Sequence, residues 1–217
     1  MTKDFKHIIE YEKGSWKMFE PSKFVYSYFA FNSFYNYDWQ KSCEVNTIFS
    51  LDIVSDDEEI KSIPEVKKMK TMIDFIFNHI VEEDKNDFIR FIKKPVKGEN
   101  PIPIEKLIES IEGITPDNRI TESERVEFKE NFNQMISENK LQIGKLKNMA
   151  RFVYLVRNNI FHGTKTTIEM SNKKQRDRLE IYANILIAIN ELLFKALEKK
   201  LCITFDKEYK LKFNDRN

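Results

Sequence analysis

Glycine and proline are scarce in this chain, and that scarcity constrains the fold more than any other feature of the sequence. The 217 residues include 5 Gly and 6 Pro, while 33% of residues are charged and 41% are hydrophobic. A β-sandwich or β-barrel needs a turn signal roughly every 8–12 residues. Because helix-breaking residues are few and charged and apolar residues are many, the sequence predicts an all-α protein. Its length predicts a single domain over residues 1–217.

Apolar residues recurring at helical spacing place the expected helices along the chain. The expected helices cover residues 21–42, about 64–80, about 85–93, 104–111, 121–139, 146–161 and about 173–200. Thr121 and Glu124 fit a capping box at the start of one of them. Residues 95–116 hold four of the six prolines, so we interpret about 95–120 as a Pro/Gly-rich connection within the domain. The tail 203–213 alternates weakly, which is compatible with extended chain.

Two expected helices carry more apolar surface than a single helix face holds. In 21–42, the rings of Phe24, Tyr28, Phe31 and Tyr35 recur at helical spacing, which favours a buried helix over a base-stacking platform. The helix at 173–200 has two apolar stripes. Such a helix is either central in the fold, or buries one face in the core and the other against a partner.

Charge is divided unevenly between the two parts of the chain. Residues 1–139 carry 19 Lys/Arg and 27 Asp/Glu, a net charge of −8, and residues 140–217 carry 17 Lys/Arg and 8 Asp/Glu, a net charge of +9. A basic part of this kind can offer a surface to a polyanion. The alternative is that the two parts attract each other within one fold.

The sequence Arg157-Asn158-Asn159-Ile160-Phe161-His162 interrupts an apolar helix with polar groups near its end. Asn158 and His162 are four residues apart and share a face of an ideal helix. Arginine presents a planar fork of donors to phosphate, and histidine moves protons near neutral pH. Together they suit phosphodiester cleavage without a metal, with the RNA 2′-hydroxyl as the nucleophile. A purely structural interpretation has His162 packed at a helix end and Arg157 paired with a carboxylate.

These residues resemble the Arg-x4-6-His motif of the HEPN superfamily, in which a polar residue commonly follows the arginine. The resemblance covers about 140–200 and implies an all-α helical bundle of HEPN type with a motif-bearing helical hairpin at about 143–200. It implies a metal-independent endoribonuclease that acts on RNA as a homodimer, in toxin–antitoxin systems or antiviral defence. Arg157, Asn158 and His162 would be the catalytic residues. Some members lack activity and only bind RNA or a partner protein. One toxin branch has a tyrosine two residues after the histidine, where this chain has Thr164.

Further expectations concern the surroundings of the motif. Arg151 and Lys165, on either side of it in the sequence, are candidate RNA-binding residues. RNA and a second copy of the chain are the expected partners, with an antitoxin or defence-system protein as a third. Because the motif lies at a helix end, we expect Arg157 to contribute little to stability. The doubly apolar helix at 173–200 would supply surface for the dimer.

We expect no metal and no cofactor. Cys43 and Cys202 lie far apart, without metal-ligand spacing. His79 lies near Glu82 and Glu83, but a histidine satisfied at a helix end is the favoured interpretation over a metal site. The amino-terminal segment has no apolar signal-peptide core, and the longest uncharged run, residues 24–37, is too short to span a bilayer. A cytoplasmic location is therefore expected.

Overall fold

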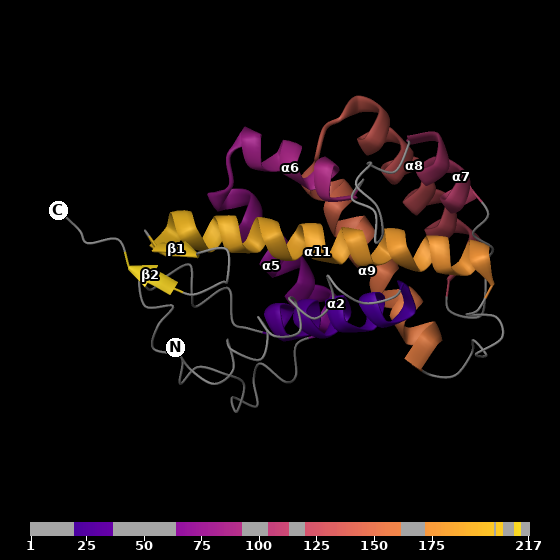
Figure 1. Cartoon of the computed structure of the whole chain (residues 1–217), viewed down its shortest axis with the longest axis horizontal. Coiled ribbons are helices and arrows are strands. Elements are labelled where there is room, and N and C mark those ends of the chain that lie inside the picture. Colours follow the sequence, from indigo (N-terminus) through magenta and orange to yellow (C-terminus); the bar gives the residue numbers. More distant parts are fainter. Residues whose placement is uncertain are drawn as a thin grey trace.

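The computed structural model describes residues 20–36, 64–92, 104–112, 120–161, 172–201, 203–205 and 211–213, and this part of the chain is predominantly helical (Figure 1). A short antiparallel pair of strands near the carboxyl end places Ile203 opposite Phe213. The prediction of an all-α fold is confirmed for the described residues, with this small ribbon added. The elements are α2 (Glu20–Tyr35), α5 (Glu65–His79), α6 (Glu82–Ile92), α7 (Ile104–Glu112), α8 (Glu122–Glu138), α9 (Ile143–Phe161), α11 (Lys173–Leu201), β1 (Ile203–Phe205) and β2 (Leu211–Phe213).

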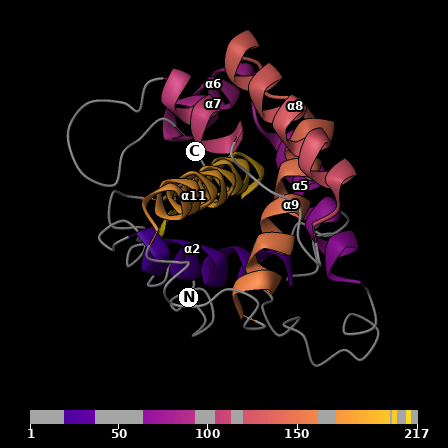
Figure 2. The same ribbon diagram turned by 90° about the vertical axis from the view of Figure 1, so that its right-hand side faces the viewer.

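Helix α11 is the axis of the fold. In Figure 1 it runs along the molecule, and in Figure 2 it is seen nearly end-on, with α2 below it and α6 and α7 above it. It contacts α2, α5, α6, α7 and α9, and its longest shared surface is with α2. Every residue from Ile181 to Asn190 is buried, which is nearly three turns of helix without an exposed face. Of the two alternatives that the sequence left open for this helix, the structure shows the central position.

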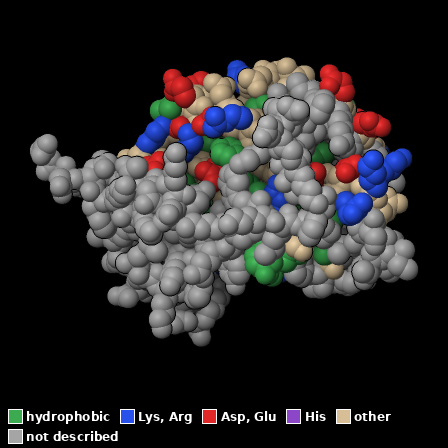
Figure 3. All heavy atoms as spheres, in the orientation of Figure 1, with side chains coloured by type: hydrophobic (Ala, Val, Ile, Leu, Met, Phe, Trp, Pro, Cys, Tyr) green, Lys and Arg blue, Asp and Glu red, His purple; other side chains and the backbone are tan. Residues whose placement is uncertain are grey.

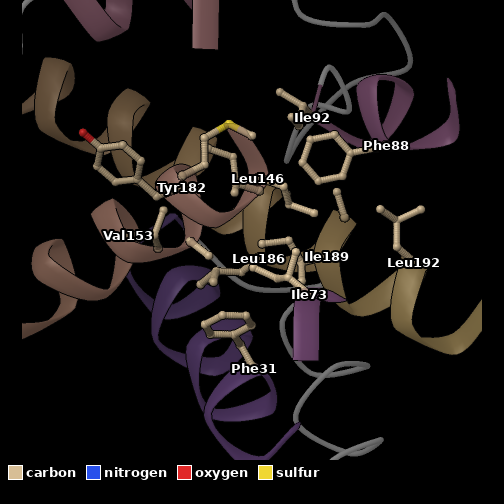
Figure 4. Packing of buried hydrophobic residues seen from close by; sticks show 14 of the residues in the cluster. Phe31, Ile73, Phe88, Ile92, Leu146, Val153, Tyr182, Leu186, Ile189 and Leu192 are labelled. Atoms are coloured by element: carbon tan, nitrogen blue, oxygen red, sulfur yellow. The ribbon is translucent and has the colours of Figure 1, made fainter. Parts of the chain in front are cut away.

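The second apolar stripe of α11 is covered by the chain's own helices, so the expectation that it supplies dimer surface is wrong. Figure 4 shows side chains of four other helices converging on it: Phe31 from α2, Ile73 from α5, Phe88 and Ile92 from α6, and Leu146 and Val153 from α9. The periodicity showed that both stripes must be buried. It did not show that the burial occurs within one chain.

Local signals account for several helix boundaries. Helix α5 begins directly after Pro64, whose missing N–H costs nothing at a helix start. The capping box at α8 is confirmed: the Glu124 N–H donates to Thr121 Oγ1 at 3.2 Å, and the Thr121 N–H donates to Glu124 Oε2 at 3.0 Å. Helix α8 ends at Glu138 and is capped by Asn139, whose φ of 49° is the left-handed conformation that asparagine tolerates well.

Some expected features fall partly outside the described residues. The Pro/Gly-rich connection at about 95–120 contains α7, and most of its remainder is not described. The helix expected over 21–42 is described as α2, which ends at Tyr35, and its four stripe residues Phe24, Tyr28, Phe31 and Tyr35 are fully buried, as predicted. No described helix is long and apolar enough to cross a lipid bilayer.

The motif-bearing helix and α11 contact each other, as expected for neighbours in a hairpin. Helix α9 does not lie along α11, however, so the side-by-side packing expected of a helical hairpin is not found. It crosses α11 steeply, and it packs more extensively on α8 and α5 (Figures 1 and 2). The carboxyl end of α9 thereby comes close to α2, the helix with which α11 shares its longest surface.

A buried polar link joins three helices inside the core. The ammonium of Lys23 in α2 donates to Asn184 Oδ1 in α11 at 2.7 Å, and Asn184 Nδ2 donates to the Ile92 carbonyl at the end of α6 at 3.1 Å. Both side chains are almost completely buried. Because the last carbonyls of a helix have no partner within that helix, the Asn184 amide satisfies a group that burial would otherwise penalise. The link fixes α2 and α6 at one position along α11.

A second polar link ties α6 to the carboxyl half of α11. Lys195 donates to Asp84 at 3.1 Å and to Asp87 at 2.7 Å, and Lys199 also binds Asp84. Asp84 accepts a further bond from the Val81 N–H at 2.9 Å. Partial burial alone would raise the pKa of Asp84, but the bonds from Lys199, Val81 and Lys195 outweigh it and hold the pKa below its usual value.

Replacing Asp84 with Asn should lower the free energy of unfolding at pH 7 by about 1–3 kcal/mol, because two lysines and a backbone N–H lose a charged acceptor. A lowered pKa stabilises the fold above the unfolded-state pKa, near 3.9, and this contribution is lost as the pH falls through the lower folded-state pKa. Urea unfolding at a series of pH values should therefore show the difference between wild type and variant shrinking in acid.

Asp87→Asn is the matched control. Its carboxylate is more exposed than that of Asp84, with 27% against 9% of the side chain accessible, so we expect a loss below about 1 kcal/mol. Equal losses for the two variants would contradict the role assigned to Asp84.

Candidate active site

Arg157 and Asn158 lie near the carboxyl end of α9, on a helix fixed by its apolar side. Met149, Ala150 and Val153 are fully buried in the core. The guanidinium of Arg157 lies against α2, with its Cζ 5.1 Å from the centroid of the Tyr28 ring. This is a cation–π contact, which strengthens when the partners are withdrawn from water. Arg157 is half-buried and Tyr28 is fully buried.

Asn158 is turned toward the arginine beside it. Arg157 Nη1 donates to Asn158 Oδ1 at 2.8 Å. In the structure the carbonyl oxygen of Asn158, one of the predicted catalytic residues, holds the guanidinium. Tyr154 lies one turn earlier in α9, and the neighbouring Asn158 lowers the pKa of its phenol.

Tyr154 lies close to Asn158 and to Glu65, the first residue of α5. Burial raises the pKa of Tyr154, the nearby Glu65 carboxylate raises it further, and Asn158 and the charge of Arg157 lower it.

Tyr28 is itself fixed by neighbours on α2. Its hydroxyl oxygen lies 3.1 Å from that of Tyr35, and the Tyr35 hydroxyl donates to Asn32 Oδ1 at 2.5 Å. Burial raises the pKa of Tyr28 and Tyr35 well above the usual value of 10.0. For Tyr28 the bond to Tyr35 and the nearby charge of Arg157 act in the opposite direction, but burial outweighs them. Both phenols are thus neutral at physiological pH.

The structure brings together two of the five predicted site residues, Arg157 and Asn158. Arg151 lies elsewhere: its Nη2 pairs with Glu124 Oε1 on α8 at 2.6 Å, whereas Arg157 contacts α2. The two arginines are six positions apart in the sequence, so they project from α9 about 120° apart. His162 and Lys165 lie outside the described residues.

The structure adds Tyr28, Tyr154 and Glu65 to the surroundings of Arg157. The sequence predicts that Tyr28 lies in the core, and the structure confirms it. One face of its ring also contacts the guanidinium. Tyr154 had a detectable signal, since it lies four residues before Asn158 and helix neighbours at that spacing meet. Glu65 had no such signal, because its approach depends on how α5 packs on α9.

His79 takes part in contacts of a structural kind. Its Nδ1 lies 2.8 Å from the Phe75 carbonyl oxygen, and its ring centroid is 4.5 Å from that of Phe75. Among the described residues, no group of three or more His, Cys, Asp or Glu side chains is arranged to hold a metal ion.

The uneven charge of the chain is partly balanced within the fold. Figure 3 shows basic and acidic side chains side by side over the described face. Several bases of the carboxyl-terminal part pair with acids of the amino-terminal part: Lys145 with Glu138, Lys147 with Asp74, Arg151 with Glu124, and Lys195 and Lys199 with Asp84. Attraction between the two parts, one of the two alternatives raised by the sequence, is therefore present.

Three other basic residues of the carboxyl-terminal part do not take part in this pairing. Lys173, Lys174 and Arg176 are exposed in the first turn of α11, and within the described residues no ion pair involves them. That turn contains no acidic residue. A helix amino terminus carries partial positive charge, so three cations are electrostatically unfavourable there unless an anion approaches.

Comparisons of the chain with protein-family models, curated proteins and solved structures give no match.

Arg157→Ala should lower the free energy of unfolding by about 0.5–2 kcal/mol, through loss of the contact with the Tyr28 ring. The contact of Arg157 with the Tyr28 ring argues against the expectation from the sequence that Arg157 contributes little to stability. Chemical unfolding is the measurement, and Arg151→Ala is the control, because its exposed surface pair is worth about 0–1 kcal/mol. If Arg157→Ala is no more destabilising than Arg151→Ala, the packed role of Arg157 is wrong.

Proposed function

We propose that this chain is a HEPN-type, metal-independent endoribonuclease. The observation that carries the proposal is the Arg157 guanidinium, held by the Tyr28 ring and by Asn158 on the helix that leads directly to His162. A planar guanidinium binds two phosphate oxygens at once and stabilises the negative charge that develops on them during cleavage. Holding it before the substrate arrives lowers the cost of reaching the transition state.

In the proposed reaction the RNA 2′-hydroxyl oxygen attacks the adjacent phosphorus, and the bond to the 5′-oxygen of the next nucleotide breaks. The 2′-hydroxyl loses its proton to a base, and the leaving 5′-oxygen receives a proton from an acid. His162 supplies these transfers and Arg157 binds the phosphate. The products are a 2′,3′-cyclic phosphate and a 5′-hydroxyl. Asn158 supports the reaction by orienting Arg157.

The basic first turn of α11 supports RNA as the substrate. In the sequence, a short segment that contains Lys165 joins His162 to the basic residues Lys173, Lys174 and Arg176. Their cationic charge is not balanced by ion pairs within the described part of the chain. A nucleic-acid backbone would place phosphates against this charge and release counterions. Arg151, in contrast, is already paired with Glu124.

The proposed active form is a homodimer in which two copies of the motif face one cleft. One transfer needs a base and the other an acid, and each chain has one histidine in the motif. A two-fold axis would supply both groups from identical chains. A role as a toxin or antiviral-defence ribonuclease, restrained by an antitoxin or a defence-system protein, completes the proposal.

A non-catalytic HEPN-type domain that binds RNA or a partner protein is the second candidate. One observation favours it: the contacts of Arg157 with Tyr28 and Asn158 would also suit an arginine that serves only to join α9 to α2. Cleavage assays separate the two candidates, because binding without cleavage is expected only from the second.

Incubation of the full chain with structured RNA in EDTA should yield fragments that end in 2′,3′-cyclic phosphate. His162→Ala should reduce the rate by about 100-fold or more, the usual contribution of an acid–base group. Arg157→Lys should also be severely impaired, because an ammonium cannot replace a bidentate fork. Circular dichroism checks that each variant is folded. Cleavage that stops in EDTA, or survives His162→Ala, would contradict the mechanism.

Replacing Lys173, Lys174 and Arg176 together with Gln should weaken RNA binding and flatten its salt dependence. Three lost phosphate contacts correspond to a change of about 2 in the slope of log K against log salt for a single strand. Filter binding or fluorescence anisotropy at several salt concentrations measures that slope.

The matched control removes the same charge elsewhere. Lys70, Arg90 and Lys140 are exposed and lie outside α9 and α11. Their triple replacement by Gln should leave the salt slope close to that of the wild type. Equal slopes for both triple variants would show that α11 provides only general positive charge.

A mixed dimer of one wild-type and one His162→Ala chain should cleave far below half the wild-type rate. Each composite site would then lack either its acid or its base. Co-expression with two affinity tags isolates the mixed species. A mixed dimer that retains half the activity, or a fully active monomer in sedimentation, would show that each chain works alone.

A further inference from the structure

The side of α2 that points away from the core carries no charge, and we call it the outward face. Its exposed and half-buried residues include Ser22, Val25, Tyr26, Phe29, Ser33 and Asn36. Between Ser22 and Asn36 the only charged residue is Lys23, which is buried and donates to Asn184. The solvent side of a helix normally carries charged residues. Helices α5, α6 and α8 follow this rule, with exposed residues such as Lys67, Glu82 and Glu127.

Phe29 lies at the middle of the outward face. It is the largest of the exposed bulky hydrophobic side chains in the described part of the chain, with 36% of its surface accessible. Its ring packs edge-on with that of Tyr26, with the centroids 6.1 Å apart. Figure 3 shows hydrophobic side chains at the surface along α2. An accessible aromatic ring in uncharged surroundings is typical of a surface that another protein covers.

The outward face adjoins Arg157. Tyr28, whose ring centroid is 5.1 Å from the Arg157 Cζ, immediately precedes Phe29. Consecutive residues of a helix project about 100° apart, so the guanidinium lies on the flank of α2, beside the outward face. A helix with its side chains is about 10–12 Å across, and a protein that packs on the outward face comes within roughly that distance of Arg157.

An uncharged face suits a second copy of the same chain. A two-fold axis brings the same patch of both chains together, so any net charge on the patch would face its own sign. The outward face of α2 avoids this repulsion, because it offers aromatic rings, serines and asparagines. A partner of different sequence would not require the face to be free of both signs of charge.

The position of Arg157 on the flank selects the orientation of the pair. When two α2 helices meet face to face and run antiparallel, the two-fold axis lies between them and perpendicular to both. Rotation about this axis keeps the Arg157 of each chain on the same side of the pair, so both line one groove. Parallel helices would place the two arginines on opposite sides. Packed helices have axes about 8–10 Å apart, which keeps the two arginines close.

We propose that a second copy of this chain packs antiparallel on the outward face of α2, centred on Phe29. This inference rests on the proposed function, which needs two motifs in one groove. In this register Phe29 meets the partner's Phe29, and Val25 meets the partner's Ser33. The 16 residues of α2 span about 24 Å. A face of this length is smaller than a standard interface of about 800 Å² per partner, so the dimer dissociates at micromolar concentration.

Phe29→Lys tests the interface, because it places two lysines against each other across the two-fold axis. In sedimentation experiments that span micromolar concentrations, the wild type should dimerise reversibly and the variant should stay monomeric. At concentrations where the wild type is dimeric, the variant should cleave RNA about 10-fold or more slowly. Val126→Lys is the matched control, since Val126 on α8 is equally exposed at 37%. It should change neither measurement.

A mixture of Phe29→Lys and Phe29→Glu chains should recover the dimer and the cleavage that each variant lacks alone. Opposite charges then meet across the axis, whereas each variant by itself places like charges together. Damage to the fold by Phe29→Lys would not be repaired by a chain of opposite charge. The mixture therefore separates loss of the interface from loss of the structure.

Val25→Lys combined with Ser33→Glu in one chain tests the orientation. In the antiparallel pair the introduced lysine of each chain meets the introduced glutamate of the other, so the dimer should be retained. Parallel helices would bring like charges together. A double variant that is monomeric while the wild type is dimeric would overturn the proposed register.

The outcomes separate this inference from the proposed function. A wild type that stays monomeric, or a Phe29→Lys variant that dimerises like the wild type, overturns the interface, and RNA cleavage by the wild type would still support the ribonuclease function. A wild type that dimerises through α2 but cleaves no RNA overturns the proposed function and leaves the interface in place.

Discussion

Burial of α11 around its whole circumference is the constraint on which the rest of the structure depends. A helix that is apolar on every side must be enclosed by other helices, and this chain supplies them from α2, α5, α6, α7 and α9. Apolar contact alone does not fix where along α11 each helix lies. For α2 and α6, two polar links do so: Asn184 binds Lys23 of α2 and the end of α6, and Lys195 and Lys199 bind Asp84 of α6.

The candidate active site follows from that packing. Helix α2 is held along α11, and its Tyr28 ring reaches the end of α9, where it meets Arg157. Helix α5 packs on α9 and brings Glu65 to Tyr154. The guanidinium is therefore oriented by a tyrosine of α2, a helix more than a hundred residues before Arg157 in the sequence. A site supported in this way keeps its geometry only while the core is intact, so stability and activity are coupled at Arg157.

Sequence reasoning succeeded where the physical signal is local. The start of α5 after Pro64, the capping box of Thr121 and Glu124, and the buried aromatic stripe of α2 all depend on neighbouring residues. It failed where packing decides the outcome. Two apolar stripes on α11 do not reveal whether another chain or the same chain covers them. The spacing in α9 likewise does not reveal that Arg157 lies on a tyrosine of α2, while Arg151 pairs with α8.

The central claim is that the 2′-hydroxyl of the RNA is the nucleophile and that Arg157 and His162 assist it. The most direct measurement takes an RNA that the chain cleaves at a mapped bond and replaces the nucleotide on the 5′ side of that bond with its 2′-deoxy form. We expect cleavage to disappear at that bond and to continue at other sites, since only the nucleophile is lost. Continued cleavage at the deoxy position would show that water or another group attacks the phosphate, and would contradict the account.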